Sequence, residues 1–241
     1  MEKRAVVLAG GQGTRLRPYT ITFPKPLMPI GETPILEIVL KQLVSHGFSR
    51  ITLAVSHQAA LIRTFFGDGS KWGATVDYSL ETTPLGTMGP LRLIADLPEN
   101  VLVMNGYVLT DLDYAEFFDW HCREGAGLSI GATEREQYVD FGVLTSNGRD
   151  EVVGFQEKPT LRYLVSMGVY GLNRRVLDWL PPGEPFGFDQ LVLRLLEARQ
   201  RIVVRRHPGY WLDIGRPEDF ERATEDFAGQ ESRFFRPPLP G

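Results

Sequence analysis

Short β-rich runs alternate with segments of helical periodicity over the first half of the chain. Four of these runs predict strands, at 5–9, 51–55, 75–80 and 101–104. Helical spacing of apolar residues predicts helices at 33–47, 59–66, about 88–95 and 114–123. The first helix has the clearest ends, with Thr33 as the expected N-cap, Pro34 in the first helical position and Gly47 as the stop. Strands separated by helices of this length predict a Rossmann-like α/β three-layer sandwich with a mainly parallel sheet, since parallel strands need long crossovers.

The pattern changes in the second half, where strands follow one another closely. Strands are predicted at 128–133, 141–145, 151–157 and 165–172, and Asn147-Gly148 between the second and third is typical of a hairpin turn. We therefore expect residues 1–230 to form one domain, in which about 128–172 are an inserted antiparallel lobe. Helices at 189–199 and 217–227 and a strand at 201–206 complete it, and the proline-rich tail, 231–241, is expected to be peripheral.

Composition limits the classes of partner. The 26 basic and 30 acidic residues give a net charge of −4, and no basic stripe runs along the chain, which argues against nucleic-acid binding. Cys122 is the only cysteine, so a disulfide framework and a thiolate metal site are excluded. No signal-peptide pattern and no apolar run of the roughly 20 residues that span a bilayer are present. We expect a cytoplasmic protein that does not associate with membranes.

A glycine-rich loop follows the first predicted strand. Gly10, Gly11 and Gly13 allow the backbone to approach phosphate oxygens closely, and successive N–H groups can then face one anion. The lysine of a P-loop and the third glycine of a dinucleotide fingerprint are both missing. The glycines alone are also compatible with a tight strand-to-helix turn.

Two cations follow this loop. Arg15 comes directly after it, and Lys25 lies between Pro24 and Pro26. Proline fixes φ and stiffens the chain, so Lys25 is expected to project from a preset position. Residues 5–30 therefore indicate a triphosphate-binding segment.

Longer motifs contain these residues. LAGGQGTRLRP at 8–18 and FPKPLMPI at 23–30 resemble the signature of sugar-1-phosphate nucleotidyltransferases. ETTPLGT at 81–87, FQEKP at 155–159 and YWLDIG at 210–215 continue the resemblance in the same order. The sequences of these motifs most resemble those of mannose-1-phosphate and heptose-1-phosphate guanylyltransferases. The resemblance implies attack by a sugar 1-phosphate on the α-phosphorus of a nucleoside triphosphate, with release of pyrophosphate, and it leaves a homodimer open.

The resemblance also implies roles for single residues. Arg15 is expected to hold the β- and γ-phosphates, and Lys25 the α-phosphate and the attacking sugar phosphate; these are the two expected catalytic residues. The expected nucleotide-binding residues are Leu8, Ala9, Gly10, Gly11, Gly13, Thr14, Glu81, Pro84, Gly86 and Thr87. The inserted lobe is expected to bind the sugar, and the expected sugar-binding residues are Asn105, Gly142, Glu157, Lys158 and Ser166.

Glu81 bears on the choice of base. Guanine presents N1–H and N2–H₂ donors, which one carboxylate can accept together, whereas uracil and thymine offer a single N–H. The sequence therefore favours GTP, with a uridylyl- or thymidylyltransferase as the alternative. Glu81 is also compatible with a solvated acid at the end of a strand, and Glu157 and Lys158 with a surface salt bridge. Ser166 replaces an asparagine common in relatives, so the sugar is left open.

Tyr107 departs from the family pattern. Relatives hold Mg²⁺ between two aspartates; Asp213 supplies one, and Asn105-Gly106-Tyr107 has a phenol in place of the other. Magnesium prefers charged oxygen ligands, and a neutral phenol is a poor one. Three interpretations stay open: a weakened nucleotide-sugar-binding regulator, an enzyme whose metal is held by Asp213 and phosphates with help from Asp111, or a substituted form of a normal enzyme.

Overall fold

The computed structural model describes residues 3–11, 13–21, 23–56 and 58–235. Within these ranges a seven-stranded sheet has the order β12-β8-β11-β6-β1-β4-β5. Its strands are β1 (Lys3–Leu8), β4 (Phe48–Val55), β5 (Thr75–Leu80), β6 (Asn100–Asn105), β8 (Leu128–Tyr138), β11 (Thr160–Asn173) and β12 (Ile202–Arg206). Strands β5, β4, β1 and β6 are parallel, β11 is antiparallel to β6 and β8, and β12 is parallel to β8. The predicted mainly parallel sheet is confirmed.

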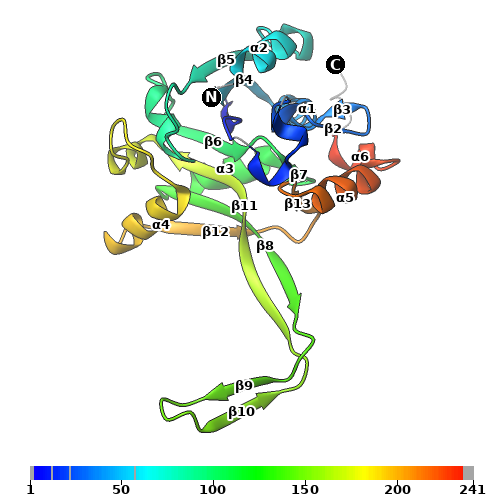
Figure 1. Cartoon of the computed structure of the whole chain (residues 1–241). Coiled ribbons are helices and arrows are strands. Elements are labelled where there is room, and N and C mark those ends of the chain that lie inside the picture. The colour runs from blue at the N-terminus through cyan, green and yellow to red at the C-terminus, as the bar shows by residue number, and fades with distance from the viewer. Residues whose placement is uncertain (1–2, 12, 22, 57, 236–241) are drawn as a thin grey trace.

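Helices cover both faces of this sheet (Figure 1), and apolar side chains pack between the helices and the sheet. The helices are α1 (Ile35–Ser45), α2 (Ala59–Phe66), α3 (Tyr114–Glu124), α4 (Phe188–Glu197), α5 (Pro217–Phe227) and α6 (Glu231–Phe234). Successive residues of β1 point to opposite faces, so Ala5 and Val7 pack in one core with α1, α2 and α3. Val6 and Leu8 pack in a second core with α4. Apolar cores on both faces confirm the predicted three-layer α/β sandwich. No helix of the described part is long and apolar enough to cross a membrane.

Two local predictions are wrong. Helix α1 begins at Ile35, because Thr33–Pro34 forms β3, pairs with β2 (Pro29–Ile30), and so cannot cap the helix. The helix predicted near 88–95 is a short 3₁₀ segment, Gly89–Leu93, in which the Leu91 amide donates to the Met88 carbonyl three residues earlier.

A short antiparallel pair lies outside the main sheet. It consists of β7 (Val108–Thr110) and β13 (Trp211–Asp213), and Asp213 pairs with Val108. The Ile214 amide also donates to the Tyr107 carbonyl at 3.1 Å. This pair therefore brings residue 107 beside the YWLDIG motif at 210–215, although the two are far apart in the sequence.

Part of the predicted inserted lobe belongs to the main sheet. The inner parts of β8 and β11 belong to the main sheet, while residues 133–165, here called the arm, extend away from it (Figure 1). At its end, β9 (Val143–Ser146) pairs antiparallel with β10 (Val152–Gln156) around the turn predicted at Asn147-Gly148.

The predicted peripheral tail is in part a packed segment. Helix α6 places Phe234, which is buried, in a third apolar cluster with Ile214 and Phe227. The Gln42 side chain donates to the Phe234 carbonyl at 2.9 Å. The proline-rich residues 236–241 lie outside the described residues.

Candidate active site

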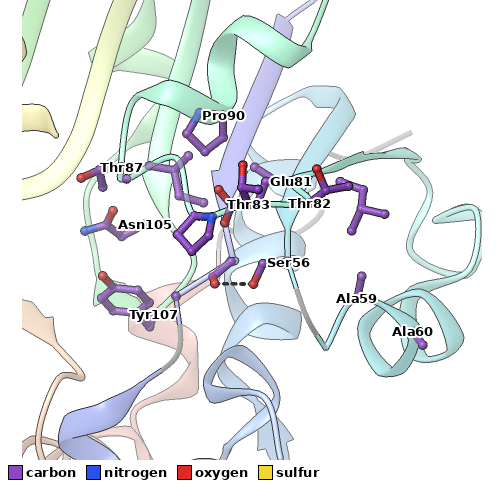
Figure 2. A pocket seen from close by; sticks show the side chains of 17 residues that line it. Ser56, Ala59, Ala60, Glu81, Thr82, Thr83, Thr87, Pro90, Asn105 and Tyr107 are labelled. Carbon is purple, nitrogen blue, oxygen red and sulfur yellow. Dashed lines mark hydrogen bonds between the residues drawn. The ribbon is translucent and has the colours of Figure 1, made fainter. Parts of the chain in front are cut away.

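The carboxyl ends of the parallel strands border a pocket of about 930 Å³ (Figure 2). The pocket lies at the carboxyl end of β1, which has β4 on one side and β6 on the other. The strand order reverses at this point, and open α/β sheets bind ligands at such reversals. Seven of the ten expected nucleotide-binding residues line it: Leu8, Gly10, Gly11, Glu81, Pro84, Gly86 and Thr87. Its volume is in the range of small-molecule sites, which extends to about 1,000 Å³.

A smaller pocket of about 140 Å³ adjoins it. Its lining includes the expected nucleotide-binding residues Gly13 and Thr14 and both expected catalytic residues, Arg15 and Lys25. Ala9 lines neither pocket; its amide donates to the Ala54 carbonyl at 2.8 Å, so it anchors the start of the glycine loop.

Close packing fixes the glycine loop. The Ser56 hydroxyl donates to the Gly10 carbonyl at 2.6 Å, and the Thr20 hydroxyl donates to the Gly13 carbonyl at 2.7 Å. Gly13 has a φ of +60°, and a Cβ there would lie 3.1 Å from the Cβ of Lys25. Glycine is therefore favoured at 13, because a side chain on this backbone would be strained and would press on Thr20 and Lys25. Gln12, between these anchors, lies outside the described residues.

Arg15 reaches the smaller pocket across Gly215. A Cβ at residue 215 would lie 3.2 Å from Nη2 of Arg15, so the absence of a side chain makes room for the guanidinium. Gly215 is the last residue of the YWLDIG motif, and it lines the same pocket. The early glycine loop and this late motif thus meet at one site.

Lys25 is the buried cation of the site. Only 6% of it is exposed, and its Nζ lies 3.1 Å from the centroid of the Tyr107 ring. Burial lowers the pKa of Lys25 to about 8, an effect that the nearby Asp213 carboxylate partly offsets. The side chain comes from a short 3₁₀ turn, Lys25–Leu27, that follows Pro24 at a φ of −62°.

The residues around Asp213 do not form a two-carboxylate magnesium site. One buried oxygen of Asp213 has no hydrogen-bond partner within the described ranges, and burial raises the pKa of this carboxyl while Lys25 lowers it. The second position holds the Tyr107 phenol, whose pKa burial raises, so it carries no charge near neutral pH. Among the described residues no group of three or more His, Cys, Asp or Glu side chains is placed to hold a metal ion.

Asp111, which the sequence suggests as an additional magnesium ligand, is hydrogen-bonded to three other residues. Its Oδ1 accepts the Tyr210 amide at 2.7 Å and lies 2.7 Å from Nε2 of His207. Its Oδ2 accepts Nε of Arg233 at 2.8 Å. The carboxylate therefore joins the chain before β13 to helix α6, and both of its oxygens have protein partners.

Glu81 faces the glycine loop from the end of β5 (Figure 2). Its Oε2 accepts the Leu85 amide at 3.1 Å, and its Oε1 would lie 2.5 Å from a Cβ on Gly10. Burial raises the pKa of this carboxyl, with the Leu85 hydrogen bond lowering it. Glu81 is half-buried, and its carboxylate lies at the pocket wall.

The expected sugar-binding residues are not all in one place. Asn105 lines the larger pocket, and its Oδ1 is buried without a hydrogen-bond partner in the described part of the chain. Gly142, Glu157 and Lys158 are exposed on the arm and line neither pocket; Nζ of Lys158 lies 3.8 Å from Asp140. Ser166, at the base of the arm, is hydrogen-bonded to the Tyr170 hydroxyl at 3.3 Å.

Sequence reasoning missed part of the pocket wall. Ser56, which directly follows β4, and Ala59 and Ala60 at the start of α2 line the larger pocket. Their position after a buried strand is a usable signal, since the carboxyl ends of parallel strands meet at one edge. The small side chains leave room for a ligand between β4 and α2.

Comparisons with known proteins identify the family of this chain. The family model described as "Nucleotidyl transferase" matches residues 4–230. The mannose-1-phosphate guanylyltransferase of Mycobacterium tuberculosis is 34% identical over 230 residues, which cover 92% of this chain and 64% of that protein. The UTP–glucose-1-phosphate uridylyltransferase of Synechocystis is 30% identical, with 95% of this chain and 64% of that protein covered. The chain therefore spans less than two thirds of the length of these relatives.

Solved structures have a similar fold. HddC from Yersinia pseudotuberculosis is 28% identical with a TM-score of 0.72, and the match covers 93% of this chain and 99% of that one. The structure of HddC complexed with GMP-PN is similar with a TM-score of 0.70. The match over residues 4–230 places the glycine loop, Arg15, Lys25 and Asp213 within one family domain. The chain belongs to the nucleotidyl transferase family.

Proposed function

We propose that this chain transfers a nucleoside monophosphate from a nucleoside triphosphate to a sugar 1-phosphate, giving a nucleotide-sugar and pyrophosphate. The observation that carries the proposal is the meeting of Arg15 and Lys25 in a small pocket beside the glycine loop. The larger pocket next to it has room for a nucleoside. A triphosphate that spans both pockets presents its α-phosphorus where they join.

The reaction needs positioning and charge neutralisation more than it needs an acid or base. An oxygen of the sugar phosphate, already ionised near neutral pH, forms the new bond to the α-phosphorus. The bond from that phosphorus to the bridging oxygen breaks, and its electron pair leaves with pyrophosphate. Arg15 offsets the charge on the leaving group, and Lys25 offsets the charge on the two reacting phosphates. Since the residues present do not fit a two-carboxylate magnesium site, no step is assigned to a metal ion.

GTP is the favoured triphosphate. Glu81 places a carboxylate at the wall of the larger pocket, where it can accept two donors from guanine. The name of the Mycobacterium relative and the GMP-PN complex of HddC support guanine. The name of the Synechocystis relative supports a uridylyltransferase as the second candidate. No comparison supports a regulatory protein, and a homodimer and a cytoplasmic location stay predictions from the sequence.

A substrate panel tests the proposal. Pyrophosphate release is measured with each of four nucleoside triphosphates and with mannose, heptose and glucose 1-phosphates. We expect the highest kcat/KM with GTP and one of these sugars. Higher values with UTP or dTTP would contradict the role of Glu81, and no release with any pair would contradict the transferase itself.

A further inference from the structure

Tyr107 lies at the junction of the two pockets. Among the described residues only Gly11 and Tyr107 line both pockets, and Gly11 has no side chain. Tyr107 is therefore the side chain that a triphosphate passes when its nucleoside occupies one pocket and its phosphates the other. The tyrosine is also held in place, since the Ile214 amide donates to its carbonyl at 3.1 Å.

The charges around this junction are mainly positive. Arg15 and Lys25 line the smaller pocket, and no described carboxylate does so. Asp213 is the anion that acts most strongly on Lys25. An aspartate at 107 would add a second carboxylate, so that two anions would oppose two cations at a site for a polyanion. The phenol removes one of these negative charges.

The Tyr107 ring also positions Lys25. The face of an aromatic ring attracts a cation, and Nζ of Lys25 lies 3.1 Å from the ring centroid. A carboxylate in this position would pair with the ammonium and neutralise it. The ring holds the ammonium in place and leaves its full charge for a phosphate.

We propose that this site binds the nucleoside triphosphate in its metal-free form, with Lys25 held on the Tyr107 ring at the α-phosphate. The inference rests on the proposed function and specifies the ionic form of its substrate. Tyr107 acts through Lys25 and is a positioning residue. This positioning of Lys25 depends on two features of the tyrosine, its neutral side chain and its aromatic face.

Calorimetric titration with an α,β-methylene analogue of GTP tests the inference, in excess EDTA and in excess magnesium. For each of the wild type and Tyr107→Phe, which keeps the ring, we expect the Kd in EDTA and the Kd in magnesium to differ by less than about threefold, a small free-energy difference. Tyr107→Asp is expected to lose about tenfold or more in EDTA and to recover with magnesium. Tyr107→Leu, neutral but without a ring, is expected to bind weakly in both conditions.

The outcomes distinguish failure of this inference from failure of the proposed function. A wild type that needs magnesium as strongly as Tyr107→Asp would overturn the inference and leave the proposed function intact. Absence of binding by any triphosphate in both conditions would overturn both. A Tyr107→Leu variant that binds as tightly as the wild type in EDTA would show that the ring does not position Lys25. Far-UV circular dichroism and thermal melting check that each variant is folded.

Discussion

Asn105 and Gly168 are in such close contact that a Cβ on residue 168 would lie 2.5 Å from Nδ2 of Asn105. Gly168 also has a φ of +73°, a conformation that favours glycine. Asn105 ends β6 at the wall of the larger pocket, while Gly168 lies on β11 just inside the base of the arm. The Asn105 amide therefore occupies the space that a side chain on residue 168 would need.

The variant Gly168→Ala should be destabilised. The new methyl group would collide with Asn105 on a backbone that disfavours any side chain, and such strain costs about 1–3 kcal/mol. Urea denaturation measures the loss in the free energy of unfolding. Gly148→Ala is the matched control, because a Cβ there meets nothing within 4 Å; it should change stability by less than about 0.5 kcal/mol. Equal losses in both variants would contradict the steric account.

Arg15 and Arg17 offer a comparison between two arginines two positions apart. Both are exposed, but only Arg15 lines the smaller pocket. Arg15→Ala should lower kcat/KM about 10²- to 10³-fold, the usual loss when a preorganised group at developing charge is removed. Arg17→Ala should change it less than about threefold, as surface substitutions do. Similar losses in the two variants would mean that the pocket does not receive the triphosphate.

Glu81→Gln should reduce the preference for GTP. The amide oxygen can still accept the Leu85 amide, but a neutral group binds the two guanine donors less strongly. Losing a charge-assisted hydrogen bond, about 1.5–3 kcal/mol, should lower kcat/KM for GTP about 10- to 100-fold. Asp77→Asn is the control: Asp77 lies on β5, the strand that Glu81 follows, accepts a hydrogen bond from Arg50 and lines neither pocket. The ratio of GTP to UTP activity should stay constant in this control and fall in Glu81→Gln.

The main sheet and much of the lining of the two pockets could be predicted from the sequence, for a physical reason. Buried parallel strands have continuous apolar runs, and their carboxyl ends meet at one edge, so the segments that follow β1, β4 and β5 must lie close together. The pair β7 and β13 could not be predicted, because three-residue strands are too short to show a period. This pair nevertheless brings Tyr107 beside Asp213 and Ile214.

The position of the arm residues could not be predicted from the sequence either. Gly142, Glu157 and Lys158 match family motifs, yet they lie on a two-stranded extension outside both pockets. Periodicity predicts which residues form strands but not how far a pair of strands continues past the sheet. The contact of Lys25 with Tyr107 depends likewise on two turns far apart in sequence, and neither turn predicts the other.

His121 is a buried titratable group in α3, and it is fully shielded from solvent. Its Nδ1 lies 2.7 Å from the Ser129 hydroxyl, and an interaction with the Leu172 backbone opposes part of the effect of burial on its pKa. Burial lowers the pKa of His121 from 6.5 to about 4. The folded protein therefore keeps this ring neutral at pH values where the unfolded chain protonates it.

The unfolded chain thus binds more protons than the folded protein between pH 6.5 and about 4. The free energy of unfolding should fall as the pH is lowered through this window, by at most about 1.4 kcal/mol per pH unit for one proton. Urea denaturation at several pH values measures this slope, and His121→Gln, which cannot be protonated, should show a smaller one. Equal slopes in the two proteins would mean that another group causes the loss of stability.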